Sequence, residues 1–322
     1  MRGIEGERVG WVMAGEQGTL PRRAVAEFVG SAALVAVIVG SGIQASGLSE
    51  DTGVRLLANS LASAIGLGLL IALFAPVSGA HLNPVVTLSV WWTGRRGAAG
   101  LTGRGVALYV AAQSAGAVAG ALLAEAMFGR PPGAWSTQLR SDGHLLLGEV
   151  VATAGLVLLI QGLERIGRAA LAPVAVAAYI AAAIWFTSSG SFANPAATVG
   201  RSLTDSFTGI APASLPGFIA AQLLGGLLGA VLAALLYGGR PASPAAPAAG
   251  PAAPSPAAPS PAAPSPAAPS PAAPSPAAPS PAAPAVPALG PAGQVPPTPE
   301  SFARVPPLPA PPAPGPTAPP GR

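Results

Sequence analysis

The chain has 322 residues, of which 51% are hydrophobic and only 9% are charged, and the apolar residues fall in long blocks. This composition is typical of a membrane protein. The chain contains no cysteine and only two histidines, which excludes disulfides and thiolate chemistry and leaves little material for a metal site. The net charge is +4, but the arginines lie between apolar blocks without interleaved aromatics, so we expect neither a nucleic-acid partner nor a cofactor.

The first apolar block follows a polar, glycine-rich segment. Residues 1–21 are expected to form a cytoplasmic N-terminal segment, which Arg22 and Arg23 follow. The block over residues 24–43 has roughly the 20 residues that a helix needs to cross a hydrocarbon core of about 30 Å. It lacks a convincing signal-peptide cleavage site, so we interpret it as the first membrane span.

Five more apolar blocks predict the remaining spans, at residues 56–75, 105–128, 145–163, 169–187 and 213–237. Six crossings place both termini on one side of the membrane. If that side is the cytoplasm, the inner group of arginines is the larger one: Arg22, Arg23, Arg95, Arg96, Arg104, Arg165, Arg168 and Arg240. The outer group is smaller: Arg55, Arg130, Arg140 and Arg201. The positive-inside rule therefore predicts a multi-pass protein of the inner (plasma) membrane with both termini in the cytoplasm.

Two apolar segments of about ten residues are too short to cross a bilayer alone. Each follows a Gly/Ser-rich turn, and they begin at Asn83-Pro84 and Asn194-Pro195. Asparagine suits the N-cap of a helix, and proline suits its first turn, where the missing N–H costs nothing. We predict two re-entrant half-helices of about 15 Å each, which together form one broken crossing.

An internal repeat relates the two halves of the chain. Residues 111–124 match residues 220–233, and the two Asn-Pro pairs are separated by nearly the same offset. Each half contains three spans, so the second copy must be inserted upside down, and the two asparagines then meet near the midplane. We predict an all-α membrane protein with six transmembrane helices and two re-entrant half-helices, in inverted three-span repeats at about residues 22–128 and 144–240.

These features resemble the aquaporins and aquaglyceroporins of the major intrinsic protein superfamily, over residues 22–240. The first span contains Ala26-Glu27-Phe28, as members of the family do. The family's two Asn-Pro boxes correspond to Asn83, Pro84 and Val85, where Val85 replaces the usual alanine, and to Asn194, Pro195 and Ala196. The resemblance implies a passive channel for small neutral solutes in the lipid bilayer, and a homotetramer with one pore in each subunit.

The boxes have a direct physical interpretation. The N-terminus of each half-helix carries about half a positive charge, and both point at one place, so cations and protons are repelled there. The amides of Asn83 and Asn194 can donate to the oxygen of a neutral solute, which remains hydrogen-bonded after losing its water. Capping alone would also explain the asparagines, and it is compatible with pore lining.

The resemblance also implies a selectivity filter on the outer side of the boxes, formed by Ile65, Ile184, Ser191 and Ala197. Trp185 is the alternative to Ile184. Ala197 stands where the family nearly always has arginine, so a wide, mostly apolar ring is expected. Arsenite channels of this family similarly have a small residue before a Gly-Arg pair, here Gly200-Arg201. Glycerol-like polyols or the hydroxides arsenite and antimonite are therefore favoured over water alone, although a water-selective aquaporin remains an alternative.

Two further residues are assigned to the pore or its mouth. Arg201 lies one turn beyond Ala197. We expect it either to carry the displaced filter charge in the outer vestibule, held by Asp205, or to form an ordinary solvated pair with Asp205. By resemblance, His81 lines the cytoplasmic half of the pore, and no second metal ligand stands near it in the sequence.

Acidic and glycine residues inside the spans have structural interpretations. Glu27 and Glu149 are proton-relay candidates, but the resemblance implies that each accepts hydrogen bonds from the backbone of a re-entrant loop. The spaced glycines permit close helix contact, and they are Gly116, Gly120, Gly225 and Gly229. A secondary transporter can also be built from inverted repeats, but apart from Glu27 and Glu149 we place no acid near the asparagines.

Residues 241–322 are mostly proline, alanine, serine and glycine, with a tandem Pro-Ala-Ala-Pro-Ser repeat. Such a segment cannot bury a core, so we predict a disordered tail with polyproline-like conformation. It is either a dispensable extension or a spacer or binding segment for a partner of unknown identity. We find no nucleophile and base pair or phosphate-binding loop in the chain, so we do not expect an enzyme.

Overall fold

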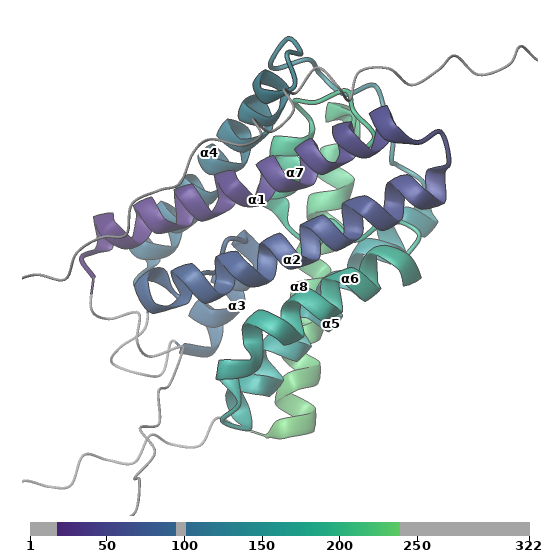
Figure 1. Ribbon diagram of the computed structural model, residues 1–322. Coiled ribbons are helices and arrows are strands. Elements are labelled where there is room, and N and C mark those ends of the chain that lie inside the picture. The colour runs from purple at the N-terminus through teal and green to yellow at the C-terminus, as the bar shows by residue number, and fades with distance from the viewer. Residues whose placement is uncertain (1–17, 95–100, 239–322) are drawn as a thin grey trace, which may run out of the picture. The chain divides into compact units, whose positions relative to one another are not determined.

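A computed structural model describes residues 18–94 and 101–238, and every regular element in these ranges is helical. The predicted fold class is confirmed, because the described part contains six helical segments that are long and apolar enough to cross a membrane. In chain order (Figure 1) the long helices are α1 (Leu20–Leu48), α2 (Thr52–Ser78), α4 (Gly103–Met127), α5 (Gly143–Arg165), α6 (Ala172–Phe186, after the 3₁₀ turn η2, Ala169–Leu171) and α8 (Leu215–Tyr237, after the 3₁₀ turn η3, Pro212–Ser214). The protein is therefore a multi-pass membrane protein.

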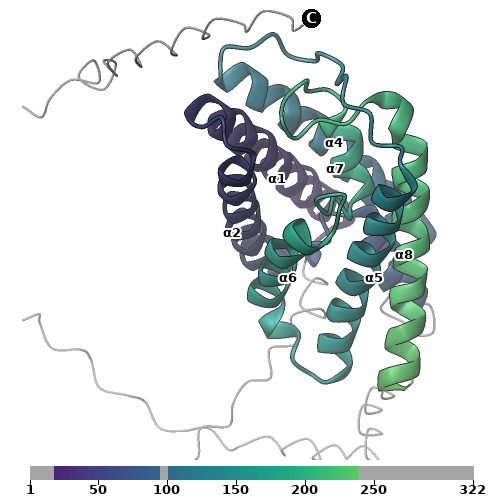
Figure 2. The same ribbon diagram turned by 90° about the vertical axis from the view of Figure 1, so that its right-hand side faces the viewer.

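The two predicted half-helices are present as α3 (Pro84–Gly94) and α7 (Pro195–Arg201). Helix α7 has seven residues and is therefore shorter than the predicted length of about ten. In Figure 2, α1, α2, α6, α5, α8 and α4 follow one another around α7. Helix α7 thus lies inside the bundle, and both short helices begin immediately after buried asparagines, so protein rather than lipid surrounds their N-terminal ends.

Local sequence explains where the helices begin and end. The side chain of Asp51 caps α2 by accepting a hydrogen bond from Val54 N at 2.9 Å. Thr102 caps α4 through Gly105 N at 3.2 Å. Helix α2 ends at Ser78 and is followed by Gly79, whose φ of 90° lies in the left-handed region that glycine adopts without strain. The chain then turns back into the bundle toward α3.

Glycines allow the helices within each repeat to approach closely. Helix α1 packs on α4, and α5 packs on α8. A Cβ atom added at Gly116, Gly120, Gly225 or Gly229 would collide with a carbonyl oxygen of the neighbouring helix, that of Phe28, Ala32, Val150 and Ala154, respectively. These four glycines therefore stand at close helix contacts, as their spacing predicted, and the contact is made in the same way in both repeats.

Each half-helix also packs on a long helix of the opposite repeat. Helix α7 contacts α4 of the first repeat, where a Cβ at Gly200 would meet the carbonyl oxygen of Ala117. Helix α3 contacts α8 of the second repeat, where a Cβ at Gly226 would meet the side chain of Val85. The centre of the bundle is thus built jointly by the two repeats.

Some predictions fall outside the described residues. These are most of the N-terminal segment, Arg95 and Arg96, Arg240 and the tail at 241–322. Helix α1 begins at Leu20, two residues before the expected start of the channel domain at residue 22, with a proline in its first turn. One acid was also missed: α4 carries Glu125, which is 1% exposed. Its carboxylate accepts a short hydrogen bond from Thr204 and pairs with Arg130 at 2.8 Å. Glu125 is therefore neutralised by a partner at the end of the bundle, away from the asparagines.

Candidate functional site

A cavity of about 400 Å³ lies among the helices and is lined by residues of both repeats. Its lining includes Thr52, at the start of α2, and Glu164, near the end of α5. These two residues stand at opposite ends of the bundle in the six-span topology. Asn83 and Asn194 line the same cavity. The cavity therefore follows the path that a solute would take across the membrane.

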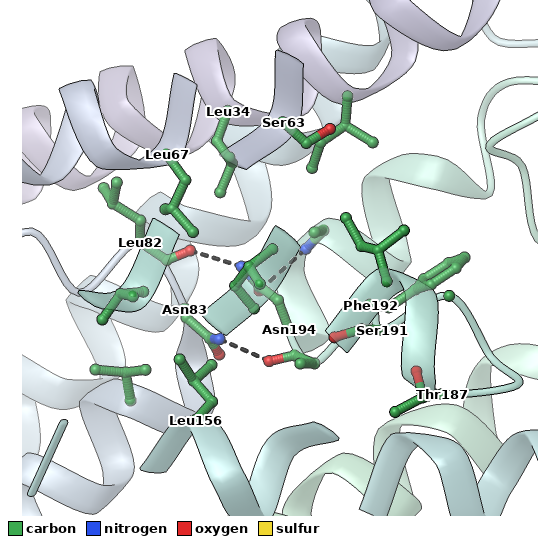
Figure 3. A pocket seen from close by; sticks show the side chains of 18 of the residues that line it. Leu34, Ser63, Leu67, Leu82, Asn83, Leu156, Thr187, Ser191, Phe192 and Asn194 are labelled. Atoms are coloured by element: carbon green, nitrogen blue, oxygen red, sulfur yellow. Dashed lines mark hydrogen bonds between the residues drawn. The ribbon is translucent and has the colours of Figure 1, made fainter. Parts of the chain in front are cut away.

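The two asparagines each bind the backbone of the other repeat. Asn83 Nδ2 donates to the carbonyl oxygen of Ala193 at 2.7 Å, and Asn194 Nδ2 donates to that of Leu82 at 2.8 Å. Figure 3 shows these reciprocal bonds beside the cavity. The Asn-Pro boxes thus meet, as the inverted repeat requires.

The remaining bonds of the asparagines fix how their amides face. Asn83 Oδ1 accepts from Val85 N at 2.9 Å, and Asn194 Oδ1 accepts from Ala196 N and Ala197 N at 3.0 and 3.2 Å. The amide oxygens are therefore held as helix caps. An amide nitrogen carries two N–H groups and the inter-repeat bond uses one, which leaves one donor on each asparagine for the cavity.

The turns before the boxes adopt a strained backbone in both repeats. Four residues other than glycine have φ angles between 46° and 49°, and they form two symmetry-related pairs: Ala80 and Ser191, and Leu82 and Ala193. Such left-handed conformations cost of the order of 1 kcal/mol or more for each residue. They persist only where the surroundings define the backbone, and here the left-handed turns direct main-chain N–H groups toward a buried acid.

Glu27 and Glu149 supply those surroundings. Glu27 accepts from His81 N at 3.0 Å and Leu82 N at 2.7 Å, and Glu149 accepts from Phe192 N at 2.9 Å and Ala193 N at 2.8 Å. Both carboxylates are fully buried. They thus accept the loop N–H groups, as the resemblance implied, and they have the structural role rather than the position of a relay along the pore.

Two glutamines and two threonines complete this network and were not singled out from the sequence. Gln113 Nε2 donates to Glu27 at 2.7 Å and to Thr87 Oγ1 at 2.9 Å. In the second repeat, Gln222 Nε2 donates to Glu149 at 2.7 Å and to Thr198 at 2.9 Å. The glutamines stand at the same place in the repeated stretches 111–124 and 220–233, so the repeat itself carried the signal.

His81 lines the cavity on the side of the first box, where the resemblance placed it. Its Nδ1 lies 3.1 Å from Thr87 Oγ1, and its ring packs edge-on against Tyr109 at 5.4 Å. In the described residues, no group of three or more histidine or acidic side chains is placed to hold a metal ion. His81 is therefore part of the cavity wall.

The structure corrects one of the four predicted filter positions. Ile65 is 61% exposed and points away from the cavity, whereas Ser63, two residues earlier on α2, is 4% exposed and lines it. Successive helical residues are about 100° apart, so positions two apart lie on nearly opposite faces. Ser63, Ile184, Ser191 and Ala197 all line the cavity, and we call them the filter ring.

The filter ring has few hydrogen-bonding groups, and two of them are free. In the described part of the chain, the buried hydroxyls of Ser63 and Ser191 have no partner. Trp185, the alternative to Ile184, also borders the cavity, but it is half exposed and its Nε1 donates to Ser60 Oγ at 3.0 Å. Two serine side chains and one alanine are small enough to leave the ring open. The two serine hydroxyls can form hydrogen bonds with a solute.

Arg201 lies in the wall of the cavity and not on a solvated surface, because only 8% of it is exposed. Its Nε donates to Thr208 O at 2.6 Å, and its guanidinium lies 3.2 Å from the ring centre of Phe192. The prediction that Asp205 pairs with Arg201 is wrong. The Asp205 carboxylate instead accepts from Thr137 N and Oγ1 at 2.9 and 3.0 Å, in the connection between the repeats.

Two inverted repeats whose half-helices bring paired asparagine amides into a cavity through the bundle define a membrane channel. The family described as major intrinsic protein matches residues 16–187 of the chain. An aquaglyceroporin of Rhizobium meliloti, AqpS, is 46% identical over 223 residues, which are 69% of this chain and 93% of the relative. This chain therefore belongs to the major intrinsic protein family, whose members are aquaporin channels.

Two further similarities extend the comparison. A glycerol uptake facilitator protein of Pseudomonas aeruginosa is 30% identical over 244 residues, 64% of this chain and 85% of the relative. The X-ray structure of an aquaglyceroporin from Plasmodium falciparum superposes with a TM-score of 0.54 at 20% identity and covers 68% of this chain and 96% of that one. The second similarity concerns the fold alone.

Proposed function

We propose that this protein is a passive channel for small uncharged solutes, namely water, glycerol-like polyols and the trivalent hydroxides arsenite and antimonite. The open filter ring is the main support, because Ala197 places no large side chain at the cavity and two free hydroxyls stand beside it. The similar channels from R. meliloti and P. aeruginosa are an aquaglyceroporin and a glycerol uptake facilitator. Their names favour a polyol over water alone.

The proposed route of a solute follows from the donors in the cavity. A hydroxyl group that leaves bulk water would bind first at Ser63 and Ser191 and then at the free N–H groups of Asn83 and Asn194. The positive ends of α3 and α7 would raise the energy of a cation at the asparagines. Arg201 would add to this barrier from the outer wall.

Orientation and assembly belong to the same proposal. The distribution of arginines supports cytoplasmic termini in the inner (plasma) membrane. A homotetramer, typical of the family, would place the outward-facing apolar side chains of neighbouring subunits in contact. The lipid bilayer and the small solutes are the partners we expect. The segment 241–322 either binds an unidentified partner or has no partner.

Stopped-flow light scattering on proteoliposomes tests the solute. We expect swelling in a glycerol gradient and uptake of arsenite, both absent from empty liposomes. Water flux without either solute flux would instead identify a water-selective aquaporin. A protonophore that abolished glycerol flux would identify a secondary transporter, whereas a channel should be insensitive to it.

A further inference from the structure

Arg140 is a second cation in the wall of the cavity, and it comes from the connection between the two repeats rather than from a half-helix. Its Nε donates to Gly209 O at 2.9 Å, and its backbone N donates to Ser214 Oγ at 2.9 Å. Its guanidinium lies 5.3 Å from the ring centre of Phe192, the ring that Arg201 also contacts. Two positive charges therefore meet at one aromatic side chain of the cavity.

The connection that carries Arg140 is attached firmly to the segment that follows α7. Ser136 N donates to Ser202 O at 2.9 Å, and Ala211 N donates to Gln138 O at 2.7 Å. The side chain of Gln138 adds a bond of 2.6 Å to Ser206 O. Arg140 is thus held in place by the main-chain bonds of Ser136 and Gln138 before it and by its own bond to Ser214, unlike an arginine on a free surface loop.

The oxygen atoms that hold Arg140 do not neutralise it. Gly209 O is a carbonyl, and the more distant contact at 3.4 Å is the amide oxygen of Gln138. The carboxylates of this region are hydrogen-bonded or paired elsewhere. Glu149 is the acid whose charge acts on both arginines, and it accepts from Phe192 N, Ala193 N and Gln222. Glu125 pairs with Arg130, and Asp205 accepts from Thr137. Burial lowers the pKa of Arg140, but a guanidinium remains charged at neutral pH.

We propose that Arg140 is a specificity-determining residue that, together with Arg201, excludes cations at the outer mouth in place of an arginine in the filter ring. Both charges lie in the wall and hold their guanidinium groups against Phe192, so they repel a cation without filling the ring beside Ala197. Because the two arginine charges are separate from the filter ring, the pore can be wide enough for a polyol and still exclude cations. The inference rests on the proposed channel function.

The test compares Arg140→Gln with Arg55→Gln in proteoliposomes that contain a trapped Na⁺-sensitive or pH-sensitive dye. Arg55 is also predicted to face outward, but it pairs with the exposed Glu50. We expect Arg140→Gln to raise the Na⁺ and proton leak by roughly three- to tenfold, because a unit charge several Å from the path is lost. Arg55→Gln should leave the leak unchanged, and glycerol swelling should persist in both variants.

A third variant separates charge from structure. Arg140→Lys keeps the positive charge, so its leak should stay near that of the wild type, whereas a leak caused by a distorted mouth would appear in it as well. The double variant Arg140→Gln with Arg201→Gln should leak more than either single variant. Unchanged leak in Arg140→Gln, with glycerol flux intact, would overturn the inference alone. Absence of glycerol flux in the wild type would overturn the proposed function.

Discussion

The side-chain amide of Asn194 donates to the carbonyl oxygen of Leu82, 2.8 Å away in the opposite repeat. The oxygen of the same amide caps α7. One side chain thus fixes the start of a half-helix, joins the two repeats and leaves a donor for the cavity. Substitutions at this position can separate the capping role from the electrostatic one.

Asn194→Asp keeps an oxygen to cap α7 but removes the donor and places a negative charge in the cavity. We expect cation leak through the channel to rise by roughly tenfold or more, because the charge offsets the positive end of the half-helix. Asn194→Ala adds no charge, and it should instead lower stability by about 1–3 kcal/mol. Dye-based leak assays and thermal unfolding in detergent measure the two effects, and equal leak in both variants would contradict the electrostatic role.

Glu149→Gln should damage the second re-entrant turn. The carboxylate accepts from two backbone N–H groups and from Gln222, and an amide would present N–H groups to some of these donors. We expect a loss of about 3 kcal/mol, visible as a lower Tm and a smaller monodisperse fraction on size exclusion. Glu50→Gln is the matched control, since its side chain is 99% exposed and its loss should cost less than about 1 kcal/mol. A Tm of Glu149→Gln equal to that of the control would be inconsistent with the network.

Ser63→Phe and Ile65→Phe test the corrected filter position. Phenylalanine at position 63 would enter the cavity, and we expect glycerol swelling to fall at least about tenfold with a smaller effect on water. At position 65 the same side chain would replace one that is already 61% exposed, so flux should not change. The opposite pattern in the swelling rates would restore Ile65 to the filter.

Gly120→Ala tests the contact between α1 and α4. The added methyl group would overlap the carbonyl oxygen of Ala32, so we expect a loss of about 1–3 kcal/mol in thermal unfolding. Gly47→Ala, also in a helix, would meet no atom within 4 Å and should be neutral or stabilising by up to about 1 kcal/mol. Similar Tm values for the two variants would show that the close contact is dispensable.

The features that the sequence predicted well are those that depend on length, capping and repetition. The spans follow from apolar blocks of sufficient length, and α3 and α7 follow from Asn-Pro starts that recur at the same offset. The resemblance implied that Glu27 and Glu149 support the re-entrant loops, and both carboxylates accept hydrogen bonds from loop N–H groups. A local pattern that appears twice leaves little freedom for another fold.

One filter position was missed although the sequence carries a signal for it, and one partner was missed because it depends on a contact between distant segments. In α2 the polar residues Asn59, Ser60 and Ser63 share one buried face of an otherwise apolar helix, and this spacing favours Ser63 over Ile65 as the residue that faces inward. Asp205 has a helical spacing from Arg201, yet it binds Thr137, which is 68 residues away. Such partners are set by how the inter-repeat connection lies across the bundle.

The exchange of half-helices between repeats bears on the order of biosynthesis. Helix α3 contacts α8 as well as α4, and among the described spans α8 is the last to leave the ribosome. The first half of the chain therefore enters the membrane with α4 beside its re-entrant helix but without the contact that α8 supplies. No residue of α8 is among those that line the cavity, so this last described helix supports the half-helices from behind and does not form the wall of the path. A chain truncated before α8 would therefore keep the residues of the cavity wall and lose the packing that holds α3 and α7 in place.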